Sequence, residues 1–215
     1  MAKTSANRGD WRHPARTAPK RSGGIPWGKL ATYLGIAVVF VAVAGMLVLL
    51  SRSSSSPMDQ ATAKPMSGAA PDFTLPTVGG GDVSLASYRG KENVLLFFNE
   101  GYGCGPCWQQ ALEMQQRLAD LKATNTAFLT IMVDPPDLLA PEVKRWGLTV
   151  PVLDDTSRTA AQAYNTLGFG MHADKPNHTF VFIDKAGVIR WWKDYASMRA
   201  PADEVIKKVQ SLASS

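Results

Sequence analysis

The chain has 215 residues, of which 45% are hydrophobic and 19% are charged, which is typical of a protein that buries a core and excludes a disordered chain. It carries a formal net charge of +5 at pH 7 and contains only two cysteines and three histidines. Any site that binds a metal through Cys and His would therefore use almost all of these residues.

Residues 1–29 are predicted to form a basic cytoplasmic tail. One acid, Asp10, stands against seven basic residues: Lys3, Arg8, Arg12, Arg16, Lys20, Arg21 and Lys29. The tail thus has a charge of +6, which leaves −1 for the rest of the chain. Because this excess precedes an apolar stretch, the positive-inside rule places the N-terminus in the cytoplasm. The basic charge faces the anionic leaflet, and we exclude nucleic acid as a partner.

The stretch Leu30–Leu50 runs for 21 residues without a charge. A helix of this length, rising about 1.5 Å per residue, spans the roughly 30 Å hydrocarbon core of a bilayer. The hydrophobic region of a cleaved signal peptide is shorter, about 7–15 residues. We therefore predict a retained transmembrane helix over residues 30–50 in a single-pass protein of the cell membrane, with the C-terminal domain outside the cytoplasm.

Residues 51–69 are rich in Ser, Ala and Pro and lack an apolar period, so we expect a flexible linker. A single compact domain is expected over residues 70–215. The predicted elements, in chain order, are a strand at Val94–Phe98, a helix at Cys107–Ala123, a strand at Thr126–Val133, helices at Asp137–Trp146 and Thr156–Leu167, strands at Thr179–Ile183 and Val188–Trp192, and a helix at Ala202–Leu212. This order predicts an α/β fold with a central mixed sheet flanked by helices.

Both cysteines lie in the sequence Cys104-Gly105-Pro106-Cys107, between a buried strand and the start of a helix. Free backbone N–H groups and the helix dipole stabilise a thiolate at this position. Pro106 suits the first helical turn because it has no N–H group and its φ angle is fixed. We expect Cys104 to be the nucleophile and Cys107, one turn later and more buried, to resolve the mixed disulfide.

Two other interpretations of the cysteines stay open. A disulfide across so short a loop could be a structural staple, although it would remove little entropy from the unfolded chain. Cys104, Cys107, His172 and His178 could also supply four ligands to a structural zinc ion.

The Cys-Gly-Pro-Cys sequence after an apolar strand resembles the active-site motif of thioredoxins. The segments Ala70–Gly80, Val83–Phe98 and Thr179–Gly187 resemble the N-terminal extension, first central strand and late hairpin of the redoxin branch of that superfamily. With an anchor in front, the chain is similar to membrane-tethered thiol-disulfide oxidoreductases of the TlpA/ResA type.

That resemblance implies a thioredoxin-like fold and disulfide exchange with client proteins, with no cofactor and no metal. Gly-Pro between the cysteines resembles the reducing thioredoxins, so the implied reaction is reduction of client disulfides, for example in apocytochrome c. An oxidising role stays open. A reductase outside the cytoplasm also implies a membrane electron donor of the DsbD/CcdA type.

The same segments resemble peroxiredoxins of the AhpC/TSA group, which makes a thiol peroxidase the main alternative. Counting from Phe98 places Cys107 at the peroxidatic position of their Pro-x-x-x-Thr-x-x-Cys motif. Cys104 then replaces the threonine and Glu100 replaces the proline. A Sco-type copper chaperone, which uses two cysteines and a histidine, is a third interpretation.

The chain departs from the TlpA/ResA pattern at several positions. Gly103 and Gln110 stand where a Trp and a Glu are usual, so the proton acceptor for Cys107 is open. Glu100 and Glu113 are the nearest acids, and a solvated surface role is expected for each.

His178 falls at the place of the cis-proline that faces the thioredoxin active site, two residues after Pro176. It is either an exposed loop residue or a residue that fronts the disulfide. In the second case an imidazolium would stabilise the thiolate or protonate the leaving sulfur.

Overall fold

The computed structural model describes residues 38–39, 41–44, 46, 64–168 and 172–214. The predicted basic tail, most of the predicted span at residues 30–50 and residues 51–63 of the linker lie outside the described residues. Among those described, no helix has both the length and the apolar character needed to cross a bilayer. The fold is carried by residues 64–168 and 172–214.

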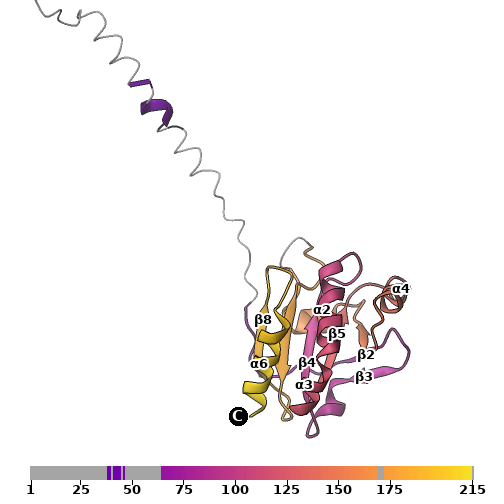
Figure 1. Ribbon diagram of the computed structural model, residues 1–215. Helices are drawn as coiled ribbons and strands as arrows, with labels where there is room; N and C mark the ends of the chain where they lie inside the picture. The colour runs from indigo at the N-terminus through magenta and orange to yellow at the C-terminus, as the bar shows by residue number, and fades with distance from the viewer. Residues whose placement is uncertain (1–37, 40, 45, 47–63, 169–171, 215) are drawn as a thin grey trace, which may run out of the picture. The chain divides into compact units, whose positions relative to one another are not determined.

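A mixed sheet of six strands forms the centre of the domain, in the order β1-β8-β7-β4-β5-β6 (Figure 1). Strands β4, β5 and β6 are parallel, whereas β7 runs antiparallel to β4 and β8 antiparallel to β7. The strands are β1 (Gly68–Ala69), β4 (Asn93–Phe98), β5 (Thr126–Met132), β6 (Val152–Asp154), β7 (Thr179–Ile183) and β8 (Val188–Asp194). Strands β2 (Thr74–Pro76) and β3 (Asp82–Ser84) pair separately as a hairpin.

Helices cover both faces of this sheet. They are the 3-10 helix η1 (Leu85–Tyr88) and the α-helices α2 (Gly105–Gln116), α3 (Leu118–Ala123), α4 (Pro136–Trp146), α5 (Thr159–Ala163) and α6 (Ala202–Ala213). This arrangement confirms the predicted α/β class with a central mixed sheet.

Strand β4 divides the hydrophobic core into two layers, because all six of its residues are buried and alternate side chains point to opposite faces. Leu95 and Phe97 pack in one layer with residues of α2, α3, α4 and α6. Leu96 and Phe98 pack in the other with α5 and the segment that contains β2 and η1. The end of β4 is therefore fixed from both sides, and α2 begins seven residues after it.

Three predicted boundaries are wrong. The helix expected over residues 107–123 is two helices, because Arg117 leaves helical geometry with φ −103° and ψ 14°. The helix expected over residues 156–167 shrinks to α5, because the Asp155 carboxylate accepts N–H groups of Ala160 and Ala161 and Arg158 is left-handed. Residues 68–69, expected in the linker, form β1 and pair with β8.

Candidate active site

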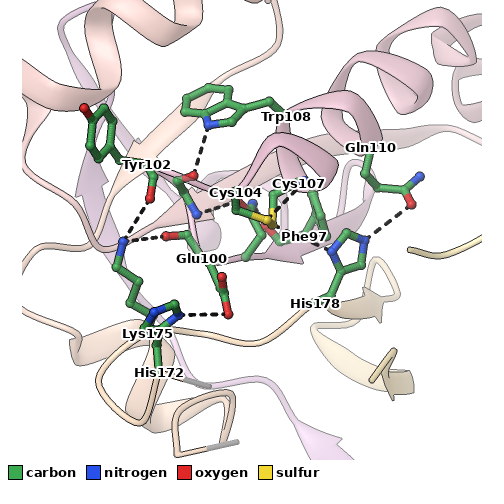
Figure 2. The surroundings of a disulfide bond; sticks show 12 residues. Phe97, Glu100, Tyr102, Cys104, Cys107, Trp108, Gln110, His172, Lys175 and His178 are labelled. Atoms are coloured by element: carbon green, nitrogen blue, oxygen red, sulfur yellow. Dashed lines mark hydrogen bonds and ion pairs between the residues drawn. A yellow bond between two sulfur atoms is a disulfide. The ribbon is translucent and has the colours of Figure 1, made fainter. Parts of the chain in front are cut away.

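Cys104 and Cys107 form a disulfide at the N-terminal end of α2, with Cα atoms 5.3 Å apart (Figure 2). Cys104 is the N-cap residue, and its sulfur accepts the backbone N–H of Cys107 at 3.3 Å. Pro106 lies in the first turn, as predicted. The N–H groups and dipole of α2 thus act on the Cys104 sulfur, and both favour its ionised form.

The two sulfurs differ in access. Cys104 is 7% exposed, whereas Cys107 is fully buried at 0%. Next to Cys107 in the chain, the buried Trp108 donates its indole N–H to the carbonyl oxygen of Gly101 at 3.0 Å. A thiol or disulfide that approaches from solvent therefore meets Cys104 first.

Lys175 holds the loop that joins β4 to α2 in place through hydrogen bonds (Figure 2). Its ammonium group donates to the carbonyl oxygens of Glu100 at 3.1 Å and Tyr102 at 3.2 Å. It also pairs with the carboxylate of Asp134 at 2.8 Å, and Asp134 accepts the backbone N–H of Tyr102. Both charged side chains are largely buried, so this pair lies where solvent screens it weakly.

Gly101 is required by the same loop. Its φ of +73° lies in the left-handed region, and a Cβ atom there would come within 2.4 Å of the Asp134 carboxylate. Its backbone N–H donates to the side-chain oxygen of Asn99 at 3.1 Å. Contacts of the backbone at Gly101 therefore fix the conformation of the loop that leads to Cys104.

The acids near the cysteines do not face the sulfurs. Glu100 was expected to be solvated, but its side chain is only 12% exposed and pairs with His172 at 3.3 Å. The carboxylate is held by its ion pair with His172, and the backbone of Glu100 is held by Lys175. Glu113 pairs with Arg199 at 3.3 Å on the outer side of α2.

His178 lies on the inner side of the disulfide and is fully buried. Its Nδ1 atom is 3.9 Å from the Cys107 sulfur, and its Nε2 atom is 3.4 Å from the Oε1 atom of Gln110 (Figure 2). The exposed-loop interpretation is therefore wrong. Burial lowers the pKa of His178 from 6.5 to about 4, so the imidazole is neutral near pH 7 while the disulfide is closed.

Sequence reasoning missed Lys175 and Asp134. Asp134 carried a usable signal, since it closely follows a buried strand that runs parallel to β4 and therefore ends at the same edge of the sheet. Lys175 lies 73 residues from Tyr102 in the chain, and nothing in its local sequence marks it. Within residues 64–168 and 172–214, no group of three or more His, Cys, Asp or Glu side chains is arranged to hold a metal ion.

Comparison with known proteins gives one family, and the relatives have names of two kinds, peroxide-reducing proteins and a thiol-disulfide oxidoreductase. The model of the AhpC/TSA family matches residues 66–192. Alkyl hydroperoxide reductase E of Mycobacterium tuberculosis is 33% identical over 140 residues, which cover 62% of this chain and 85% of that protein. The thiol-disulfide oxidoreductase ResA of Geobacillus kaustophilus is 31% identical over 130 residues, which cover 60% of this chain and 69% of that protein.

Another relative from Mycobacterium tuberculosis, whose name gives it as a peroxiredoxin, is 35% identical over 99 residues. That match covers 46% of this chain and 62% of the relative, which is less than two thirds of its length. The crystal structure of peroxidoxin BcpB from Mycobacterium tuberculosis superposes with a TM-score of 0.59 at 19% identity, covering 70% of this chain and 97% of that one. This likeness shows the thioredoxin-like fold.

Burial of a neutral His178 makes stability depend on pH. The pKa is about 4 in the folded chain and about 6.5 in the unfolded chain, so between these values only the unfolded chain binds the proton. Through this group, the free energy of unfolding is about 3 kcal/mol lower at pH 4 than above pH 6.5. The loss occurs as the pH falls from 6.5 to 4.

Urea unfolding of the oxidised chain at several pH values measures this effect. We expect His178→Asn to flatten the curve between pH 7 and 4, whereas His172→Asn keeps the wild-type slope, because His172 is half exposed. Parallel curves for the wild type and His178→Asn would contradict the assignment.

Proposed function

Because this chain belongs to the AhpC/TSA family of thioredoxin-like redoxins, we propose that it is a membrane-anchored, extracytoplasmic thiol-disulfide oxidoreductase that exchanges disulfides with client proteins. The observation that carries the proposal is the Cys104–Cys107 disulfide at the start of α2, in which Cys104 is 7% exposed and Cys107 is fully buried. An accessible sulfur at a helix N-terminus is the arrangement that exchange chemistry needs.

In the reduced chain, the Cys104 thiolate attacks one sulfur of a client disulfide. A mixed disulfide forms, and the first client thiolate leaves and takes a proton from solvent. Cys107 then attacks the Cys104 sulfur, which breaks the mixed disulfide and releases the second client thiol. The chain ends with its own disulfide closed, and two electrons have passed to the client.

We propose reduction of clients as the physiological direction. The Gly-Pro pair between the cysteines supports this direction, as does the relative named ResA. Apocytochrome c before haem attachment is a suitable client class, and a membrane electron donor of the DsbD/CcdA type would return electrons to Cys104 and Cys107.

A thiol peroxidase is the second candidate, because one relative is named an alkyl hydroperoxide reductase and another a peroxiredoxin. The cysteine at the peroxidatic position would be Cys107, and peroxide must reach that sulfur. Cys107 is 0% exposed and lies behind Cys104, so the geometry favours exchange through Cys104.

The membrane anchor is proposed from the sequence alone. The uncharged stretch at residues 30–50 and the basic residues before it support a single span with the N-terminus in the cytoplasm.

We expect Cys104→Ser to lower insulin reduction with dithiothreitol to the rate without protein, because a serine hydroxyl is not a nucleophile at neutral pH. Cys107→Ser should keep attack by Cys104 but accumulate a mixed disulfide, visible as a mass increase that dithiothreitol removes. The reverse pattern would assign the nucleophile to Cys107.

Consumption of hydrogen peroxide with a thiol donor, measured on the same variants, separates the two candidates. We expect wild-type peroxide consumption no faster than that of the Cys107→Ser variant. If the chain consumes peroxide rapidly and needs only Cys107 to do so, the proposed function would be a thiol peroxidase instead of disulfide exchange.

The reduction potential of the Cys104/Cys107 couple tests the direction. For a reductase we expect a value near that of thioredoxin, about −270 mV, measured by equilibration with a dithiol buffer. A value near about −120 mV, like that of a strong oxidant, would reverse the proposed direction.

Cell fractionation tests the anchor. The full chain should stay in the membrane pellet after alkaline carbonate extraction, and deletion of residues 30–50 should release it. Protease added outside intact spheroplasts should digest the domain of the full chain, and protection of the domain would overturn the proposed topology.

A further inference from the structure

The ring of His178 forms the inner wall of the disulfide site. It packs edge-on against Phe97 of β4, with ring centroids 4.6 Å apart, and lies 6.1 Å from the ring of Phe180 in β7. Its Nδ1 atom is 3.9 Å from the Cys107 sulfur. This distance is within reach of a hydrogen bond to a thiol, so the buried sulfur has one basic nitrogen beside it.

Gln110 determines which nitrogen of this ring carries the hydrogen. Its Oε1 atom accepts the backbone N–H of Ala200 at 2.9 Å, so the oxygen is held in place by a donor that cannot turn. The Nε2 atom of His178 is 3.4 Å from the same oxygen and must donate to it. A neutral imidazole has one hydrogen, so Nδ1 presents its lone pair to Cys107.

The other half of the Gln110 amide supports this orientation. Its Nε2 atom is buried and has no hydrogen-bond partner within the described part of the chain. Exchanging the nitrogen and oxygen would place the amide NH2 group against the Ala200 N–H, so this hydrogen bond would be lost and the Ala200 N–H left unpaired. The unpartnered amine is therefore the less costly arrangement.

We propose that His178 is the proton acceptor for Cys107 and that Gln110 is the positioning residue that sets its tautomer. The proposal rests on the proposed exchange reaction, because only there must the buried thiol become a nucleophile. It also explains how Cys107 can lose its proton although Gln110 stands where a glutamate is usual in the proteins that this chain resembles.

The proton then has a defined path. In the mixed disulfide, the Cys107 thiol gives its proton to Nδ1 of His178, and the resulting thiolate attacks the Cys104 sulfur. The bond between the Cys104 sulfur and the client breaks, the client sulfur leaves with the electron pair, and the imidazolium returns the proton to it directly or through water. In the reverse reaction, the imidazolium protonates Cys107 as it leaves.

The charges around the ring suit this role. Within residues 64–168 and 172–214, the ring of His178 contacts the side chains of Cys107, Phe97, Phe180 and Gln110, and of these only Cys107, once reduced, can titrate. The nearest acid on the adjoining strand, Asp194, bonds to the neighbours of His178 in sequence, Asn177 and Thr179.

Tyr195 contacts His178 through its backbone, and its hydroxyl donates to Glu204. Burial keeps the pKa of His178 low while Cys107 is neutral, and a thiolate at this distance raises it. Proton transfer thus creates an ion pair that stabilises both partners.

Stopped-flow reaction of the reduced chain with 5,5′-dithiobis(2-nitrobenzoate) separates the two steps. The first equivalent of thionitrobenzoate reports attack by Cys104, and the second reports attack by Cys107 on the mixed disulfide. At pH 7 we expect His178→Asn to change the rate constant of the first phase by less than about twofold. The rate constant of the second phase should fall at least about tenfold. Above about pH 9, where an ordinary thiol is ionised without a base, the second-phase rates of the wild type and His178→Asn should become equal.

His172→Asn is the matched control, since this histidine is half exposed and pairs with Glu100, and it should change neither phase. Equal second phases in wild type and His178→Asn would overturn the proposal, as would equal slowing of both phases, which indicates a structural effect. If His178→Asn does not fold, His178→Gln replaces it. A wild-type chain that releases only one equivalent would instead refute the dithiol exchange itself.

Gln110→Leu tests the positioning role. Imidazole ¹⁵N shifts should show hydrogen on Nε2 in the wild type and a mixture of tautomers in the variant, with a slower second phase. An unchanged tautomer and unchanged second phase would remove Gln110 from the proposal, and hydrogen on Nδ1 in the wild type would overturn the role of His178.

Discussion

The register of β4 is the constraint on which the site depends. Phe98, its last residue, pairs with Thr179 of β7 on one side and with Ile131 of β5 on the other. The first pairing sets His178 beside the loop that carries the cysteines, although 71 residues separate His178 from Cys107. The second sets Asp134 at the same edge. A slip of one residue would turn the β4 side chains to the opposite face and take the histidine away from the sulfur.

Burial gives the two halves of the site different chemistry. On the outer side, Cys104 combines limited access with the N–H groups of a helix end, which favours negative charge on its sulfur. On the inner side, aromatic rings pack against the His178 imidazole, and burial favours its neutral form. In the proposed exchange, the helix end favours the ionised Cys104 thiol, and Cys107 becomes charged only when His178 takes its proton.

Much of the fold was readable from the sequence, because long buried strands and amphipathic helices carry clear patterns. Strand β4 and helices α4 and α6 fall within a residue or so of their predicted bounds. Short elements were missed: β6 has three residues, and the length of α5 is set by the Asp155 carboxylate rather than by periodicity. The cysteines and Pro106 were found from their spacing. The sequence left two interpretations of His178 open, and its burial beside the disulfide arises from tertiary contacts with Phe97 and Gln110 that no local pattern shows.

Lys175 holds the loop before Cys104 through two backbone carbonyl oxygens of that loop, while its carboxylate partner, Asp134, lies outside it. Tyr102, which is 48% exposed, therefore contributes only its main chain to the placement of the sulfur. Substitution at that position can reshape what the surface recognises while the reactive atom keeps its coordinates. In the proposed exchange, client recognition at this surface and reactivity at Cys104 are thereby separable.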